Sequence, residues 1–289
     1  MLIDGKAIAD QIRQEIKATL ELQKGIKPCL AVIIVGDFGP SLIYVNRKIQ
    51  ACAETGIESV RIALPKEISE EELIAEIHQL NLKPNVNGIL LQLPLPQHIN
   101  STNVIKQISP DKDVDGLHPL NVGKMLIGDP EAFLPCTPLG IKVLLERSQI
   151  DVSGKHVLII GRSNLVGKPM AAIFMQNAPG ANATVTVAHS RSFNLKKLCL
   201  SADVVIAAIG QPKFVTAEMV KEGACVVDVG INKIVDSSKK SGYKIVGDVD
   251  FEHVKEKCAF ITPVPNGVGP MTIAMLLSNT VKSFLNISK

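Results

Sequence analysis

Hydrophobic positions in the first half of the chain alternate between the spacing of helices and that of strands. Apolar side chains recur every four residues from Ile8 to Leu20, as on one face of an amphipathic helix. Ser69 followed by Glu72 has the pattern of a capping box and marks the start of another helix. The predicted strands are 29–35, 59–64 and 88–93, and the predicted helices are 8–25, 41–55 and 69–80. Apolar strands that alternate with helices predict an α/β layer with a parallel sheet.

A second series of the same kind begins after Asp151. Its predicted strands are 156–160, 183–189, 203–209 and 225–229, with a further candidate strand at 244–249. The intervening stretch 110–138 is rich in Gly, Pro and Asp, which is typical of a domain boundary, and a helix is predicted at 139–147. A last predicted helix, 272–285, follows a turn rich in Pro and Gly and could pack on either domain. The pattern therefore predicts an α/β protein of two domains.

Net charge and its distribution argue against a nucleic-acid binder. The chain has 31 basic and 28 acidic residues, a net charge of +3, and both signs are scattered along it. The densest basic stretch, 233–244 with Lys239 and Lys240, is predicted to be a solvated loop. Because a nucleic-acid surface usually combines a basic stripe with aromatic stacking platforms, we expect no nucleic-acid partner.

Metal sites and membrane segments also have little support in the sequence. The six cysteines form no Cys-x-x-Cys pair and the six histidines no His-Glu-x-x-His or His-x-His pair, so we expect reduced thiols and no metal. No apolar run approaches the roughly 18 residues of a membrane span. Residues 1–24 carry Asp4, Asp10 and Glu15 and lack the apolar region of a signal peptide. We therefore expect a cytoplasmic protein.

Residues 156–170 have the order of strand, glycine turn and helix start that suits a nucleotide. Gly161 lets the chain leave the strand tightly, and Gly167 permits close approach of a ligand or of neighbouring backbone. Pro169 suits the first turn of a helix, whose free N–H groups and positive dipole end would face a phosphate. Such a turn can also be only a turn, but two further strands at βαβ spacing favour a nucleotide site.

The end of the next predicted strand bears on which dinucleotide binds. An Asp or Glu at that point accepts a hydrogen bond from the adenosine ribose and selects NAD, but here the strand ends without a carboxylate. Arg162, Ser190 and Arg191 could together bind a 2′-phosphate. The sequence therefore favours NADP over NAD, the alternative being two solvated surface arginines.

The predicted helix 41–55 carries a polar stripe beside an apolar one. Ser41, Tyr44 and Lys48 fall at i, i+3 and i+7, and a phenol beside an ammonium suits proton transfer. From spacing alone, a partly exposed tyrosine near a solvated lysine is the simpler interpretation. Short-chain dehydrogenases share the Tyr-x-x-x-Lys pattern, but in them the nucleotide motif comes first. The order here favours a separate N-terminal substrate domain.

Two other polar positions are unusual in their surroundings. Gln92 interrupts the apolar run 88–93, which places it at a strand end facing something polar. Asp113 and Asp115 resemble a calcium loop only faintly, because the glycine comes too early and no distal Glu follows. Asp115-Gly116 by itself is typical of a turn.

At these residues the sequence resembles the bifunctional methylenetetrahydrofolate dehydrogenase/methenyltetrahydrofolate cyclohydrolase family. The resemblance covers nearly the whole chain, and several motifs in the right order are far more specific than any one of them. The motifs are Ser41-x-x-Tyr44-x-x-x-Lys48, Gln92-Leu-Pro-Leu-Pro96, Lys112-Asp-Val-Asp115-Gly116, Cys136-Thr-Pro138, Gly161-Arg-Ser-x-x-Val-Gly-x-Pro-Met170, Asp228-Val-Gly-Ile-Asn232, Gly247-Asp-Val249, Thr262-Pro-Val-Pro265 and Gly267-Val-Gly-Pro-Met-Thr272.

The resemblance implies two α/β domains across a cleft and an assembly into a homodimer. The N-terminal catalytic domain would comprise 1–138 plus 272–289, and the Rossmann-like NADP-binding domain 139–271. The implied reactions are oxidation of 5,10-methylenetetrahydrofolate with NADP⁺ and hydrolysis of the methenyl product to 10-formyltetrahydrofolate. A monofunctional NADP-dependent dehydrogenase and a non-catalytic NADP-binding module are the alternatives.

The resemblance also assigns roles to single residues. Lys48 would be the catalytic lysine, with Tyr44 and Gln92 beside it, and Asp115 would hold the pterin ring. The substrate-binding positions are Asp115, Ser41, Tyr44, Pro265 and Gly269, and the cofactor positions are Gly161, Arg162, Ser163, Gly167, Ser190, Arg191 and Ile231.

Two positions depart from the family pattern. Asn266 stands where the family usually has Gly, but Asn tolerates a positive φ, so we expect the turn to be kept. Phe38-Gly39 differs from the common pattern before Ser41, at the rim of the implied substrate site.

Overall fold

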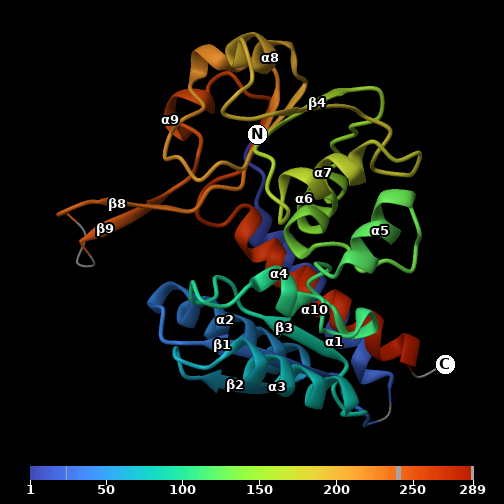
Figure 1. The fold of residues 1–289 in the computed structure, drawn as a ribbon. Helices are drawn as coiled ribbons and strands as arrows, with labels where there is room; N and C mark the ends of the chain where they lie inside the picture. The colour runs from blue at the N-terminus through green and yellow to red at the C-terminus, as the bar shows by residue number, and fades with distance from the viewer. Residues whose placement is uncertain (24, 239–241, 288–289) are drawn as a thin grey trace. The chain divides into compact units, whose positions relative to one another are not determined.

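The chain folds into two compact units (Figure 1). The computed structural model describes residues 1–23, 25–238 and 242–287. The three-stranded unit comprises residues 10–136 and 273–289, and the five-stranded unit comprises residues 1–9 and 137–272. The first residues belong to the five-stranded unit because Leu2 pairs with Ile261 and the backbone N–H of Ile3 donates to the Ile261 carbonyl at 2.9 Å.

The sheet of the three-stranded unit has β1 (Cys29–Val35) at its centre, between β2 (Glu58–Leu64) and β3 (Gly88–Leu91). The strands are parallel, as the alternation of strands and helices predicts. Every residue of β1 is buried, which explains its unbroken apolar sequence. The strand predicted at 88–93 ends at Leu91, so that Gln92 directly follows the end of β3.

Several helices complete the three-stranded unit. They are α2 (Gly39–Thr55), α3 (Glu70–Leu82), α4 (Ser101–Ile105), α5 (Pro119–Ile127), the larger parts of α1 (Gly5–Glu21) and α10 (Val268–Ile287), and the short 3-10 helix η1 (Pro110–Lys112). The predicted capping box is present at α3, where Ser69 Oγ accepts from the Glu72 N–H at 3.1 Å. Leu73 and Ile77 of α3 share a hydrophobic core with Ile33 of β1.

Helix α5 is not predicted from the sequence, because it lies inside the stretch 110–138, whose composition resembles that of a linker. Its ends are locally encoded. Pro119 occupies the first turn, the His118 ring accepts from the Leu120 N–H at 3.0 Å, and Gly128 ends the helix in the left-handed conformation.

The five-stranded unit has a parallel sheet of order β10-β7-β6-β4-β5. Its strands are β4 (His156–Ile160), β5 (Thr184–Ala188), β6 (Val204–Ala207), β7 (Cys225–Asp228) and β10 (Phe260–Ile261). Its helices are α6 (Cys136–Arg147), α7 (Gly167–Phe174), α8 (Leu195–Ser201) and α9 (Phe251–Val254), with η2 at Ala217–Met219. The strand order reverses at β4, and ligands of such sheets bind where the order reverses, beyond the carboxyl ends of the strands.

The candidate strand at 244–249 is wrong as a member of this sheet. Residues 243–246 form β9, which pairs antiparallel with β8 (Asn232–Val235) in a hairpin that projects from the five-stranded unit (Figure 1). The ammonium of Lys233 lies 4.6 Å from the centre of the Tyr243 ring. Within the solvated loop predicted at 233–244, residues 233–235 and 243–244 are therefore strand, and Lys239 and Lys240 lie outside the described residues.

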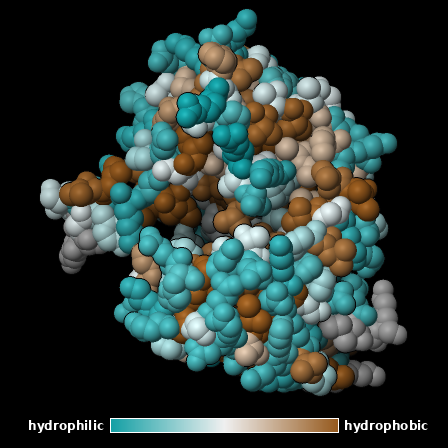
Figure 2. Space-filling model, in the orientation of Figure 1, coloured by the Kyte–Doolittle hydropathy of each residue, from teal (hydrophilic) through white to brown (hydrophobic). Residues whose placement is uncertain are grey.

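Hydrophilic residues lie mainly on the surface, and most of the cysteines lie in the interior. Hydrophilic side chains cover much of the three-stranded unit on the face shown in Figure 2. All six cysteines are free thiols, five of them buried. Among the described residues, no helix is both long and apolar enough to cross a membrane.

Candidate functional site

The polar stripe predicted on residues 41–55 lies on α2, as its spacing indicates. Val45 and Cys52 have no exposed surface and seat the helix, while Tyr44 and Lys48 are half-buried. Ser41, at the start of the stripe, is 6% exposed and so is more buried than a rim position would be. The stripe therefore faces a largely enclosed region of the three-stranded unit.

Lys48 and Gln92 come into direct contact at the end of β3. The Lys48 ammonium donates to Gln92 Oε1 at 3.0 Å, and Gln92 Nε2 donates to the Leu93 carbonyl at 2.7 Å. Because the amide nitrogen is occupied by that carbonyl, the amide oxygen is turned toward Lys48. The interpretation of Gln92 as a strand-end residue that faces a polar partner is confirmed.

Asp115 and Cys136 share the electrostatic surroundings of Lys48. Burial lowers the pKa of Lys48, and the nearby Asp115 carboxylate and Cys136 thiol oppose that shift. Burial raises the pKa of Asp115, while the charge of Lys48 and a hydrogen bond with Cys136 oppose the rise. Burial also raises the pKa of the Tyr44 phenol, against the lowering effect of Arg47. A half-buried lysine beside a half-buried carboxylate is an arrangement suited to moving a proton.

Cys136 is a member of this cluster that sequence reasoning did not single out. Its thiol donates to the Val114 carbonyl at 3.3 Å, and burial raises its pKa well above the ordinary value. The one available signal was the Cys136-Thr-Pro138 motif, which by itself gives no role to the cysteine.

The segment that carries Asp115 is held by its own polar residues. Lys112 donates to three carbonyls at the end of α3, of Leu80, Asn81 and Lys83, at 2.7–3.1 Å. Asp113 accepts from the backbone N–H groups of Leu117 at 3.1 Å and His118 at 2.8 Å, and from the Asn121 side chain at 2.8 Å. Gly116 has a φ of 68°, which confirms the predicted turn. Asp113 is therefore structural, and Asp115 is left to face Lys48.

In the five-stranded unit, the predicted nucleotide turn follows β4 and requires both of its glycines. Gly161 has a φ of 124°, and a Cβ there would lie 2.2 Å from the Ala208 carbonyl oxygen. A Cβ on Gly167 would lie 2.2 Å from the carbonyl oxygen of Gly161 itself. Neither position can take a side chain, so the backbone forms a bare cradle at the carboxyl end of β4 that fits a dinucleotide phosphate.

The start of α7 offers fewer free N–H groups than the sequence suggests. Ser163 accepts twice, at its Oγ from the Val166 N–H at 3.1 Å and at its carbonyl from the Lys168 N–H at 3.1 Å. Pro169 has no N–H to offer. Ser163 thus shapes the turn by its own contacts.

Arg162, Ser190 and Arg191 are exposed at two adjacent strand ends. Strands β4 and β5 are in register up to the pair Ile160 and Ala188, and the Gly161 N–H donates to the Ala188 carbonyl at 2.8 Å. The residues that follow therefore leave the same edge of the sheet side by side. Ile231, the remaining predicted cofactor residue, is 50% exposed and immediately precedes β8.

Two buried carboxylates organise the loops beyond β6 and β7, and sequence reasoning gave neither a role. Asp228 accepts from the backbone N–H groups of Gly230, Asp248 and Val249 at 2.8–3.0 Å. Asp248 accepts from those of Ile209 and Gly210 at 2.7 and 2.9 Å. Their motifs were visible in the sequence, but only the fold shows that the two carboxylates tie three loops together at this sheet edge.

Replacing Asp228 with asparagine is expected to lower the free energy of unfolding by about 1–3 kcal/mol, because an amide N–H₂ would meet backbone N–H donors. Burial raises the pKa of Asp228 to about 6, against the lowering effect of its backbone hydrogen bonds. The carboxyl group therefore contributes most below its unfolded pKa of about 3.9, and this contribution is lost as pH rises through about 6. Urea unfolding at several pH values checks this; a difference between wild type and variant that grows toward neutral pH would contradict it.

Pro265 and Gly269 lie in the five-stranded unit, at the start of α10. The helix begins at Val268 rather than at the predicted 272, so Gly269 is in its first turn. Asn266 has a φ of 80°, which confirms that asparagine keeps the turn. Its carbonyl accepts from the Lys6 N–H at 3.0 Å.

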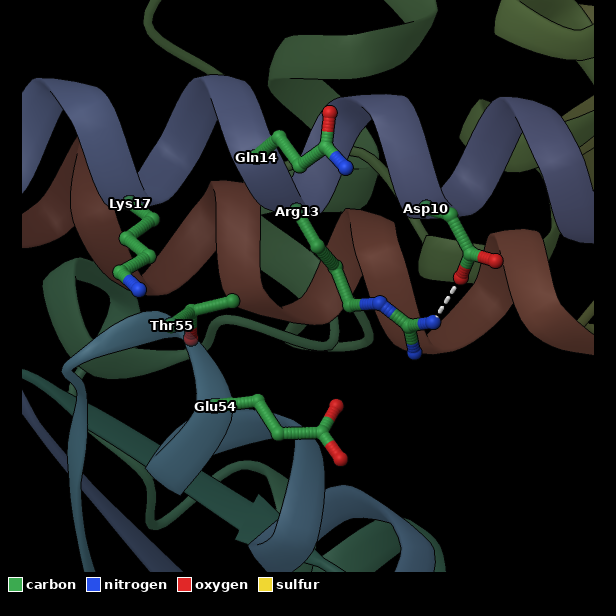
Figure 3. A pocket seen from close by; sticks show the side chains of 6 residues that line it. All are labelled: Asp10, Arg13, Gln14, Lys17, Glu54 and Thr55. Carbon is green, nitrogen blue, oxygen red and sulfur yellow. Dashed lines mark hydrogen bonds and ion pairs between the residues drawn. The ribbon is translucent and has the colours of Figure 1, made fainter.

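A hollow of about 330 Å³ lies between α1 and the end of α2 (Figure 3). Its lining is polar and consists of Asp10, Arg13, Gln14, Lys17, Glu54 and Thr55. Arg13 forms an ion pair with Asp10 on the same helix, and the two acids balance the two bases. We assign no ligand to it. Nor does the described part of the chain hold three or more His, Cys, Asp or Glu residues grouped as metal ligands.

Comparison with known proteins gives the geometry its context. Residues 3–115 match the family model for the tetrahydrofolate dehydrogenase/cyclohydrolase catalytic domain, and residues 135–288 match that for the NAD(P)-binding domain. The bifunctional protein FolD of Protochlamydia amoebophila (strain UWE25) is 66% identical over 284 residues, which are 98% of this chain and 97% of that protein.

Solved structures agree with these sequence relatives. The bifunctional FolD enzyme of Campylobacter jejuni has a TM-score of 0.93 and 50% identity, covering 99% of each chain. The dehydrogenase-cyclohydrolase of Trypanosoma brucei, complexed with NADP and an inhibitor, has a TM-score of 0.94 and 38% identity, covering 100% of this chain and 98% of that one. The expected α/β fold class is confirmed, and the chain belongs to the tetrahydrofolate dehydrogenase/cyclohydrolase family.

Proposed function

We infer that the chain is a bifunctional enzyme of one-carbon metabolism. It oxidises 5,10-methylenetetrahydrofolate to 5,10-methenyltetrahydrofolate with NADP⁺ and hydrolyses that product to 10-formyltetrahydrofolate. The observation that carries the second reaction is Lys48, whose ammonium is held at 3.0 Å by Gln92 and whose pKa is lowered by burial beside Asp115. Hydride transfer alone does not require a base to accept a proton, so a monofunctional dehydrogenase does not explain the lowered pKa of Lys48. A module that only binds NADP does not explain the contacts among Lys48, Gln92 and Asp115.

NADP is the cofactor, and the five-stranded unit supplies its proposed binding groups. When bound, NADP⁺ accepts the hydride released from the methylene carbon of the folate. Gly161 and Gly167 leave the backbone bare for its phosphates, and Ser163 fixes the turn between them. Arg162 and Ser190, with Arg191 beside them, offer donors for the 2′-phosphate, and Ile231 offers an apolar contact.

The hydrolysis needs a neutral base, and we assign this role to Lys48. Water attacks the cationic methenyl carbon, and Lys48 accepts a proton before the ring opens. Burial favours the neutral amine, and the positive charge of the bound folate shifts it further in the same direction. Gln92 holds the amine in place through its amide oxygen, which can accept a hydrogen bond in either protonation state of the lysine.

The folate itself would be held by an acceptor and a set of lining residues. The Asp115 carboxylate can accept hydrogen bonds from the N–H donors of the pterin ring, and its charge is favoured by Lys48. Ser41 and Tyr44 lie on the same helix as Lys48. Pro265 and Gly269 are assigned to the substrate by the family motif alone.

One reaction mixture tests both activities at once. It contains the protein, 5,10-methylenetetrahydrofolate and NADP⁺, and NADPH and the methenyl product are followed separately. Both activities require NADPH to rise while the methenyl compound disappears faster than it hydrolyses in buffer. Accumulation of the methenyl compound would leave a dehydrogenase alone, and folded protein that forms no NADPH would indicate the binding module.

Replacing Arg162 with alanine is expected to reduce the preference for NADP⁺ over NAD⁺, because a bidentate donor to the 2′-phosphate is lost. The ratio of kcat/KM for the two cofactors should fall by about tenfold, as for one charge-assisted hydrogen bond. Lys168→Ala, an exposed residue at the start of α7, serves as the control. An unchanged ratio in the Arg162 variant would reject the assignment.

We also propose that the enzyme is a cytoplasmic homodimer. The proposed assembly rests on the family resemblance. Light scattering after gel filtration should give twice the 31.0 kDa of the chain, and a monomer mass would reject the dimer.

A further inference from the structure

Helix α10 carries buried polar side chains within the three-stranded unit. Two of them, Asn279 and Ser283, contact backbone carbonyls of other segments. Asn279 is 4% exposed and Ser283 is 1% exposed. Thr280, also buried, donates back to its own helix, to the Leu276 carbonyl 2.8 Å away. Because a buried polar group is costly without partners, the partners of Asn279 and Ser283 indicate what each of them holds.

The side-chain nitrogen of Asn279 donates to two carbonyls from two separate stretches of chain. It lies 2.8 Å from the Val114 oxygen and 3.1 Å from the Leu134 oxygen, so both of its hydrogens have an acceptor. The Cys136 sulfur lies 3.8 Å away. We propose that Asn279 is a positioning residue that fixes Asp115 and Cys136 relative to each other and to Lys48. This inference rests on the proposed function of that cluster.

The two stretches that Asn279 joins lead to Asp115 and to Cys136. Val114 is bonded directly to Asp115, and the Cys136 thiol donates to the same Val114 carbonyl at 3.3 Å. The backbone at Gly116 packs so closely on Leu134 that a Cβ there would lie 2.5 Å from the Leu134 carbonyl carbon. A shift of either stretch therefore moves the carboxylate from its place beside Lys48, and misplacement by about 1 Å can cost about 100-fold in rate.

Ser283 provides a matched control one helical turn further along α10. Its hydroxyl lies 2.6 Å from the Asn87 carbonyl oxygen and 2.8 Å from that of Asp111. It thus joins α10 to two backbone stretches with the same kind of contact. Asp111 lies four residues before Asp115, whereas Asn279 holds the carbonyl of Val114, the direct neighbour of Asp115. Truncation of Ser283 therefore reports the cost of losing an anchor of the same kind that is farther from the carboxylate.

The test compares Asn279→Ala with Ser283→Ala, after thermal unfolding has shown how much stability each variant loses. Binding of tetrahydrofolate is measured by anaerobic calorimetry, so this readout does not depend on turnover. We expect Kd for tetrahydrofolate, and KM for the methylene substrate, to rise about tenfold in the Asn279 variant and less than about twofold in the Ser283 variant. The KM for NADP⁺ should stay unchanged in both. Equal effects on folate in the two variants would overturn the inference.

The pH dependence of hydrolysis gives a second readout that a merely structural role would not move. The groups that face Lys48 from other elements are Asp115, Cys136 and the neutral amide of Gln92. Since the Asp115 charge raises the pKa of Lys48, its displacement should shift the acid limb of the cyclohydrolase profile to lower pH in the Asn279 variant alone. An unshifted profile would count against the proposal.

The experiment must distinguish an incorrect inference about Asn279 from a variant that fails to fold and from an incorrect proposed function. If the alanine variant does not fold, Asn279→Ser takes its place in the test. Serine keeps one donor, so this variant should raise the folate Kd by less than the tenfold expected for alanine. Wild-type protein that binds tetrahydrofolate without turnover would remove the proposed function, while the comparison of folate Kd between the variants would still decide the role of Asn279.

Discussion

Replacing Lys48 with methionine is expected to lower the cyclohydrolase rate by about 10²- to 10⁴-fold, the range of a lost general base, and the dehydrogenase rate much less. Methionine keeps most of the length of the side chain but cannot accept a proton. Hydride transfer mainly needs the two reactants held in position, and Lys48 contributes to that only through the folate. The two rates are measured separately, as NADPH formed and as methenyl compound consumed.

Gln50→Met is the matched control for this substitution, because Gln50 lies on the same helix and is exposed. We expect it to leave both rates near those of the wild type. Equal loss of the two activities in the Lys48 variant would contradict the division of labour and would make the lysine a binding residue. In the wild type, the cyclohydrolase rate should fall as the medium becomes acidic, because protonation of Lys48 removes the base.

Asp115→Ala is expected to raise the KM for folate by about 10- to 100-fold, corresponding to about 1.5–3 kcal/mol for a charged hydrogen bond. The KM for NADP⁺ should stay the same, since every proposed cofactor residue belongs to the five-stranded unit. Removal of the carboxylate also removes a charge that raises the pKa of Lys48, so the acid limb of the cyclohydrolase profile should move to lower pH.

Asp111→Ala controls for the loss of an acidic side chain in the same loop, because the Asp111 side chain is exposed. An unaltered folate KM in the Asp115 variant would reject its assignment to the pterin ring. An acid limb that moved to higher pH would instead mean that the carboxylate acts on the base in some other way than through its charge.

The regular elements could largely be predicted because apolar runs and caps are local signals. Strand 29–35 matches its prediction at both ends, since all of its side chains are buried and none is polar. Helix α5 could not be found in this way, because its nine residues are embedded in a stretch whose Gly and Pro content is that of a linker. The hairpin was missed because 244–249 has the composition of a strand, and composition does not reveal which strand it pairs with.

The site could be predicted only as far as residues on one helix are concerned. The spacing of Tyr44 and Lys48 places them together wherever the helix packs. Contact between Lys48 and Gln92 spans 44 positions along the chain, and Cys136 and Asn279 are more distant still. Those contacts depend on tertiary packing, and in one sequence no local pattern encodes them. The family motifs named several of the residues without giving their geometry.

Neighbouring charged residues in the segment 112–115 have different partners. The Lys112 ammonium donates to carbonyls at the end of α3, the Asp113 carboxylate accepts from backbone N–H groups of the following turn, and Asp115 lies near Lys48. Inserting or deleting one residue between Asp113 and Asp115 would shift one acid relative to the other, so that both could not keep the contacts they make now.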